Sequence, residues 1–292
     1  MNSFMHKKST IALGLAPALV LYLVFVILPI GRSFAFGFTE WNGLSKPVFA
    51  GLYNFRRIFT DPVFWTSLKN NAFVVLASVF AQIPLGILAA VALSAKLRFA
   101  RFFRTAFFVP MVLSTVVVGL LWSTILNAQV GPLKAILEAA GVAVTPNWLG
   151  DPAIAMYTLC GVIVWQFVGL YMVIFLAALQ NISEELLEAA EIDGAGETAK
   201  LFKIRLPLLR PTIAAAVVLC ISGSMRSFDL IYVMTAGGPA HATEVMATYM
   251  YNKTFTVYQY GYGSAVSLVI CVISFALIVG GRALLARAGE QE

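Results

Sequence analysis

The side chains that could do chemistry in this chain lie inside long apolar runs. Arg226 and Asp229 are the clearest ionisable residues in such a run, and charged groups at membrane depth usually face a cavity or pair with one another. Their spacing of three would place them on one face of a helix, where they could form an internal ion pair. The alternative is that one of them contacts a substrate or a gate.

A second set of side chains could bind a polyhydroxylated ligand. A sugar needs hydrogen-bonding side chains together with a flat apolar face for its ring. The run that ends near Leu179 and the run that contains Arg226 offer this mixture, with Trp165, Gln166, Phe167 and Tyr171 on the first and Ser222, Gly223, Ser224 and Ser227 on the second. Small residues also mediate helix packing in membranes, so packing remains the alternative for each serine. Gln82 and Asn127 are weaker candidates, because either could simply bridge two helices.

Motifs for enzymatic chemistry are missing from the sequence. The stretch "GAGETAK" at Gly194–Lys200 superficially resembles a phosphate-binding loop, but the required spacing fails and no strand precedes it. The three cysteines lie in apolar runs and the two histidines are far apart, which predicts neither a disulfide framework nor a metal site. We therefore expect a chain that is not an enzyme and carries no cofactor of its own.

The elements that must position these residues are membrane helices. The chain is 60% hydrophobic and 12% charged, with a mean hydropathy of +0.86. Each apolar run is long enough to cross a bilayer at about 1.5 Å per residue, and none alternates as a barrel strand would. The prediction is an all-α, polytopic membrane protein with six transmembrane helices, at Ile11–Ile30, Ala72–Ser94, Thr105–Leu126, Ala153–Leu179, Pro211–Val233 and Ser264–Leu285.

The first run is expected to be a retained helix and not a signal peptide. It is longer than a usual signal core, lacks a clear cleavage site and is followed by five more runs. We expect residues 1–71 to form the first helix and first outer loop, and residues 72–292 to form a five-helix transport core.

The distribution of Lys and Arg predicts the orientation in the membrane. With the N-terminus in the cytoplasm, 12 basic residues lie in 62 inner residues, whereas seven lie in 97 outer residues. Cytoplasmic loops carry this excess. Both termini are therefore expected to be cytoplasmic. The net charge of +6 largely reflects this bias, and nucleic-acid binding is not expected.

One long polar segment interrupts the apolar pattern. Ile182–Pro207 carries six carboxylates and three basic residues and falls on the predicted cytoplasmic side. Ser183 could cap a first helix, Gly194 and Gly196 would break it, and a second helix would run from Glu197 to about Leu206, where Pro207 stops it. Because so short a motif cannot bury its apolar side alone, we expect it to dock on a partner.

This segment resembles the EAA loop found in permease subunits of bacterial ABC importers. Glu188-Ala189-Ala190 is followed after three residues by Gly194 and after nine more by Ile204-x-Leu206-Pro207. Elsewhere, "FAGLYNF" (Phe49–Phe55) and "FDLIYVMTAGGP" (Phe228–Pro239) resemble motifs of the maltose-like carbohydrate subfamily. The segment 31–71 is too short for the large extra periplasmic domain of some maltose permeases.

The resemblance implies that this loop couples the membrane helices to an ATPase. Its implied coupling residues are Glu188, Ala189, Ala190, Asp193, Gly194, Ile204, Leu206 and Pro207. It also implies a substrate pocket, whose matching positions, with Tyr171 added, are Gln166, Phe167, Leu170, Tyr171, Cys220, Gly223, Ser224 and Ser227. The side-chain types there differ from the maltose pattern.

The implied function is translocation of a sugar across the bacterial cytoplasmic (inner) membrane by ATP-driven alternating access. The substrate would be a mono- to oligosaccharide or a related polyol or glycerol phosphate. The implied partners are a second homologous permease, two ATPase subunits that bind ATP and Mg, an extracytoplasmic sugar-binding protein and the lipid bilayer. The alternative is an ion-coupled secondary transporter with Asp229 as its ion site, which would usually show internal inverted repeats.

Overall fold

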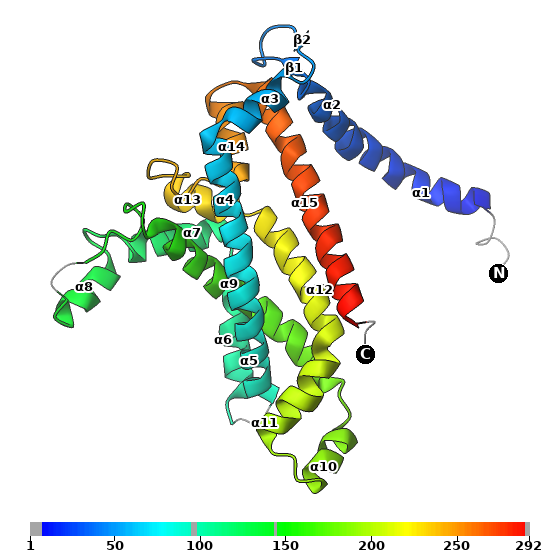
Figure 1. Cartoon of the computed structure of the whole chain (residues 1–292), viewed down its shortest axis with the longest axis vertical. Helices are drawn as coiled ribbons and strands as arrows, with labels where there is room; N and C mark the ends of the chain where they lie inside the picture. Colours follow the sequence, from blue (N-terminus) through cyan, green and yellow to red (C-terminus); the bar gives the residue numbers. More distant parts are fainter. Residues whose placement is uncertain (1–7, 95–97, 143–144, 290–292) are drawn as a thin grey trace. The chain divides into compact units, whose positions relative to one another are not determined.

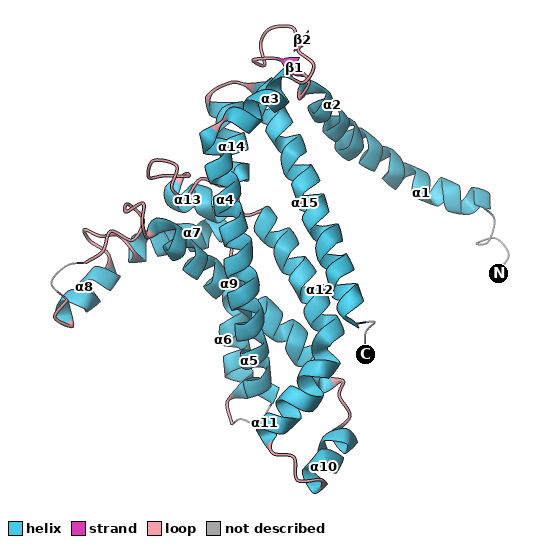
Figure 2. Cartoon of the chain, viewed as in Figure 1, coloured by secondary structure: helices cyan, strands magenta, loops and turns pink. Residues whose placement is uncertain are grey.

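The computed structural model describes residues 8–94, 98–142 and 145–289, and most of them are helical (Figures 1 and 2). The only strands in these ranges are β1 (Thr39–Glu40) and β2 (Val48–Phe49), which pair antiparallel. The all-α prediction is confirmed.

The chain forms two compact units. The first contains the described residues up to Asp61 together with Met250–Cys271. Its helical segments are α1 (Lys8–Tyr22), η1 (Leu23–Ile27), α2 (Leu28–Phe36), α3 (Tyr53–Thr60), η4 (Asn252–Thr256) and the first part of α15 (Tyr260–Gly289). Asn54 is buried and donates hydrogen bonds to the carbonyls of Gly37 and Thr39, which fixes the hairpin against α3.

The second unit spans Pro62–Tyr249 and continues in the described chain from Val272. Its helices are α4 (Pro62–Ala77), η2 (Ser78–Gln82), α5 (Ile83–Ser94), α6 (Ala100–Val112), α7 (Thr115–Ile125), α8 (Pro132–Ala139), α9 (Ala155–Gln180), α10 (Glu184–Ile192), α11 (Glu197–Lys200), η3 (Leu201–Arg205), α12 (Leu206–Met225), α13 (Asp229–Thr235) and α14 (Met246–Tyr251), the last of which ends in the first unit.

Helix α9 is the centre of the second unit. It packs along α5 and α6 and also contacts α12 and α13 (Figure 1). It is apolar on all sides, as expected of a helix surrounded by other helices. Leu159 and Ile163 belong to a buried cluster with α4, α7 and α13, whereas Met172 and Phe175 belong to a second buried cluster with α5 and α12.

Five described helices are long and apolar enough to span a membrane. They are Gly14–Phe36, Pro62–Ser94, Ala155–Gln180, Glu197–Met225 and Tyr260–Gly281. The pair α6 and α7 makes a sixth candidate span, bent by 100° at Leu113 and Ser114. This agrees with the six predicted apolar runs.

Three details differ from the predictions. The run Thr105–Leu126 is sharply bent instead of straight, and the run Pro211–Val233 is broken after Met225. Pro207 does not stop the second helix of the polar segment, because one helix runs from Glu197 to Met225. The wide turn of η3 directly precedes Pro207 and opens the regular hydrogen-bond ladder that proline would otherwise break.

A glycine sets the distance between α9 and α6. A Cβ added at Gly169 would overlap the Phe107 carbonyl group and lie 3.1 Å from the Phe108 Cα, so the two backbones are in direct contact there. Gly161, on the same helix, has nothing within 4 Å of the corresponding position.

We therefore expect Gly169→Ala to destabilise the second unit, by about 1–3 kcal/mol, because the backbone of α6 must move to admit the methyl group. Thermal unfolding of the purified protein measures this, with Gly161→Ala as the control. Equal melting temperatures for the two variants would contradict the packing.

Candidate functional site

A cavity of about 200 Å³ lies in the second unit, beside the break between α12 and α13. One wall comes from α9, a second from the C-terminal half of α12, and a third from the break itself and the start of α13. The lining residues are Gln82, Thr115, Ile163, Phe167, Leu170, Tyr171, Leu219, Cys220, Gly223, Ser224, Arg226, Ser227, Phe228, Asp229 and Leu230.

The helix break supplies much of the polar lining. Helix α12 ends at Met225, and the Arg226 and Ser227 amides close the last turn by bonding to the carbonyls of Gly223 and Ser224, at 3.1 and 3.2 Å. Helix α13 then begins at Asp229. Phe228, between the two helices, stacks on Tyr232 with ring centroids 5.1 Å apart. The break therefore exposes hydroxyl groups, two charges and an aromatic ring to one cavity.

The prediction that Arg226 and Asp229 share a helix face and form an ion pair is wrong for this structure. The two residues lie on opposite sides of the break, and within the described part of the chain no ion pair joins them. The spacing of three brings side chains together only where the helix is continuous.

Most of the predicted substrate-binding residues lie together at the cavity. Phe167, Leu170 and Tyr171 contribute from α9. Cys220, Gly223, Ser224 and Ser227 contribute from α12 and the break. Gln166 does not line the cavity: it is fully buried, and neither polar atom of its side-chain amide has a hydrogen-bond partner among the described residues.

Two further polar residues line the cavity. The sequence predicts Gln82 only as a weaker candidate and does not predict Thr115. Gln82 combines two roles, because its amide contacts the Ile163 carbonyl at 3.3 Å and the Cys220 thiol at 3.6 Å while it also lines the cavity. Thr115 reaches the cavity because the bend at Leu113 and Ser114 redirects α7. The only sequence signals for that bend are the nearby Pro110 and Ser114. Asn127 lines no part of the cavity and instead accepts hydrogen bonds from the Gln129 and Val130 amides.

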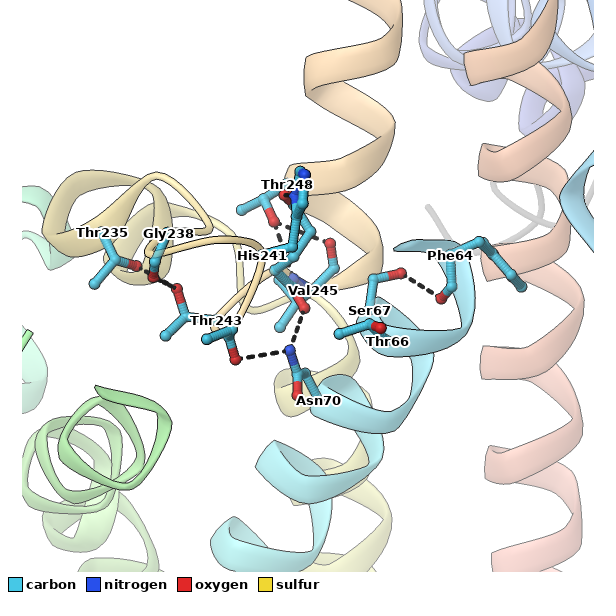
Figure 3. A network of polar contacts seen from close by, with 12 residues as sticks. Phe64, Thr66, Ser67, Asn70, Thr235, Gly238, His241, Thr243, Val245 and Thr248 are labelled. Carbon is cyan, nitrogen blue, oxygen red and sulfur yellow. Dashed lines mark hydrogen bonds and ion pairs between the residues drawn. The ribbon is translucent and has the colours of Figure 1, made fainter. Parts of the chain in front are cut away.

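A polar network holds the loop that follows α13 (Figure 3). Asn70 on α4 donates hydrogen bonds to the carbonyls of Ala242 and Glu244, at 3.0 and 2.9 Å. Thr243 bonds to the Thr235 hydroxyl at 2.8 Å and donates to the Gly238 carbonyl. This network anchors the end of α13 to α4, so the cavity wall formed by the start of α13 has a fixed support.

The loop also requires a glycine. Gly237 has a φ of +86°, and a Cβ there would lie 2.8 Å from the carboxylate of Glu244. That carboxylate is buried and lies 2.8 Å from Nδ1 of His241. The positive φ and the nearby carboxylate explain why glycine stands at position 237.

The predicted coupling residues lie on a separate part of the second unit. Glu188, Ala189 and Ala190 are on α10, Asp193 follows it, and Gly194 turns the chain with a φ of +81°. Ile204 lies in η3, whereas Leu206 and Pro207 begin α12. The structure therefore shows a helix, a glycine turn and a second helix, as predicted, although the Ser183 side chain does not cap the first helix.

Ion pairs join the two arms of this segment. The Lys200 side chain is buried, and its Nζ lies 2.6 Å from a Glu197 carboxylate oxygen and 3.2 Å from one of Glu191. Arg205 contacts Glu197 at 3.3 Å. In contrast, Ile192 is 87% exposed and Phe202 is 63% exposed, so neither apolar side chain is covered by this chain.

Comparison with known proteins identifies the family. Residues 82–287 match the family described as "Binding-protein-dependent transport system inner membrane component". The chain belongs to this family. It is therefore a membrane transport permease, and its family consists of transport components and not of enzymes.

Relatives along nearly the full chain agree. This permease is 38% identical over 269 residues to the probable ABC transporter permease protein YurN of Bacillus subtilis, covering 91% of this chain and 92% of the relative. It is 34% identical over 257 residues to the multiple sugar-binding transport system permease protein MsmF of Streptococcus mutans, covering 87% and 88%.

A solved structure of a bacterial alginate ABC transporter in complex with an alginate-bound periplasmic protein contains a chain of the same fold. The TM-score is 0.85 at 21% identity, with 97% of this chain and 96% of that chain covered. The two chains therefore share a fold although only about a fifth of their residues are identical.

The geometry of the cavity predicts which positions are accessible. In a variant that lacks the three native cysteines, a cysteine at Ser227 should react with a small maleimide in the assembled importer, whereas a cysteine at Gln166 should not. A buried thiol reacts only after local opening, and each 1.4 kcal/mol of opening free energy slows the reaction about tenfold. We expect a rate ratio of about ten or more by mass spectrometry. Equal rates would show that Gln166 reaches the cavity.

Proposed function

We propose that this chain is one of the two permease subunits of a carbohydrate importer and that the cavity at the helix break is its substrate site. The observation that carries the proposal is the lining: Phe167 and Phe228 offer flat apolar faces, and the Ser224 and Ser227 hydroxyls offer hydrogen bonds, all at a broken helix. Broken helices at membrane depth occur where they line a cavity. The relationship to MsmF, whose name describes a sugar-binding transport system, supports a sugar as the substrate.

The remaining parts of the importer are inferred from the family. An extracytoplasmic binding protein delivers the sugar, and a second homologous permease completes the pathway. Two ATPase subunits bind ATP and Mg, and hydrolysis takes place there. The assembly lies in the bacterial cytoplasmic membrane, with both termini of this chain in the cytoplasm, as the bias of Lys and Arg indicates.

The continuous helix Glu197–Met225 is the mechanical link in this proposal. Its first turn carries Lys200, which is tied to Glu191 on α10 by an ion pair. Its last turns carry Cys220, Gly223 and Ser224, which line the cavity. At about 1.5 Å per residue, about 35 Å separates Lys200 from Gly223. A displacement of α10 by an ATPase subunit therefore reaches the cavity wall through one continuous helix.

The proposed function is tested by uptake into proteoliposomes that contain the full importer, its binding protein outside and ATP inside. The probes are oligosaccharides released from starch, cellulose, xylan and chitin, together with anionic oligosaccharides from pectin and alginate. We expect ATP-dependent accumulation of at least one saccharide, detected by mass spectrometry of the lumen. Absence of any uptake, or uptake driven by an ion gradient without ATP, would overturn the proposal.

The coupling role of the loop is tested at Gly194. Gly194→Val should assemble normally but lose sugar uptake, because a β-branched residue at a φ of +81° costs about 1–2 kcal/mol or more and redirects α10. A Cβ there would meet nothing within 4 Å, so the effect comes from the backbone and not from a clash. Gly196 has a φ of −69° and equal space, which makes Gly196→Val the matched control. Normal ATP-driven uptake by Gly194→Val would contradict the coupling role.

A further inference from the structure

Arg226 and Asp229 line one cavity without neutralising each other directly. Both side chains are exposed, and within the described residues the Asp229 carboxylate has neither an ion pair nor a side-chain hydrogen bond. Arg226 donates through Nε to the Ser222 carbonyl at 3.3 Å, which leaves the terminal guanidinium nitrogens for another acceptor. The structure thus presents an unused donor group and an unused acceptor group beside the same space.

The helix break creates this arrangement. Arg226 follows the last residue of α12, and Asp229 is the first residue of α13, so the chain changes direction between them. The polar network around Asn70 and Thr243 anchors the far end of α13. The two charged residues therefore belong to the end of one helix and the start of another, and the fold holds the second helix in place.

The charges of the cavity cancel. Arg226 and Asp229 are its only lining residues with formal charges among the described residues, and the others are apolar, hydroxyl, amide, thiol or phenol groups. An anionic ligand that paired with Arg226 would bring a second negative charge into the cavity that Asp229 lines, and like charges at one site repel each other. An uncharged ligand leaves the balance intact.

We propose that Arg226 and Asp229 are specificity-determining residues that select an uncharged saccharide. Arg226 donates hydrogen bonds to ring or hydroxyl oxygens, and Asp229 accepts hydrogen bonds from hydroxyl groups, which are the two requirements of a polyhydroxylated ring. Phe228 is fixed by its stacking on Tyr232 and supplies an apolar surface next to both charges. This inference rests on the proposed function and narrows its substrate class to neutral sugars.

The experiment uses the proteoliposomes and the two saccharide sets described above. For the wild type and for Asp229→Asn and Arg226→Gln, both the uptake of each saccharide and the ATP hydrolysis stimulated by the loaded binding protein are measured. Glu138→Gln and Lys134→Gln are the matched controls, because these residues form a partly exposed ion pair on α8 and line no part of the cavity. The readout is the amount of sugar delivered per ATP hydrolysed.

We expect the wild type to take up saccharides of the uncharged set and not those of the anionic set. Loss of a hydrogen bond to a charged group should lower the sugar delivered per ATP about tenfold in Asp229→Asn and Arg226→Gln, with ATP hydrolysis preserved. The two α8 controls should behave as the wild type. A purely structural role would lower delivery and ATP hydrolysis together.

The outcomes separate this inference from the proposed function. Uptake of anionic saccharides by the wild type, or unchanged delivery in both cavity variants, would overturn the inference and leave the sugar importer intact. Absence of all uptake would overturn both. If Asp229→Asn or Arg226→Gln fails to assemble, the charge-preserving variants Asp229→Glu and Arg226→Lys are measured instead. Selective uptake of uncharged saccharides by these variants supports the inference. Continued loss of assembly in these variants would show that the two residues are structural, and would overturn it.

Discussion

The structure depends on one constraint, which is that a helix in a membrane can be interrupted only where its freed backbone groups find other partners. Between α12 and α13 this condition is met locally. The Arg226 and Ser227 amides close the end of α12, and the Tyr232 amide bonds back to the Phe228 carbonyl at 2.8 Å. The Asn70 network then holds the loop after α13. Because the interruption is stabilised in this way, the second unit can place polar side chains around a cavity.

The same constraint explains why the helix before the break is continuous. Glu197–Met225 contains Pro207 and Pro211, which would normally kink or end a helix. The wide turn of η3 precedes the first proline and accommodates it, and the helix continues to the cavity. The helix that leads to the break is continuous, so the polar segment and the cavity lie at the two ends of one helix.

Much of this arrangement could be predicted from the sequence, because its strongest signals are the composition of long segments and the spacing of residues within them. Six apolar runs, the glycine turn at Gly194 and the polar segment at 182–207 depend on composition and spacing, and the structure agrees with each. The resemblance to a known family supplies the register that assigns Phe167, Ser224 and Ser227 to one site, and all three line the cavity. Periodicity alone would not have chosen them from other residues on the same helices.

The errors at Gln166 and at the charge pair have one origin. A helical register assigns a residue to a face, but it does not reveal which face meets the cavity or where the helix ends. Gln166 precedes Phe167 by one position and therefore points about 100° away from it, into the protein interior.

Arg226 and Asp229 were treated as one turn of a helix that in fact stops between them. The pattern "SFD" at Ser227–Asp229 carries no proline or glycine, so no local signal marks the break. The loop after α13 is anchored on α4 by the Asn70 hydrogen bonds, which are tertiary contacts that no local pattern encodes. The two charged residues therefore lie on either side of a break that the sequence does not mark, and both line the cavity.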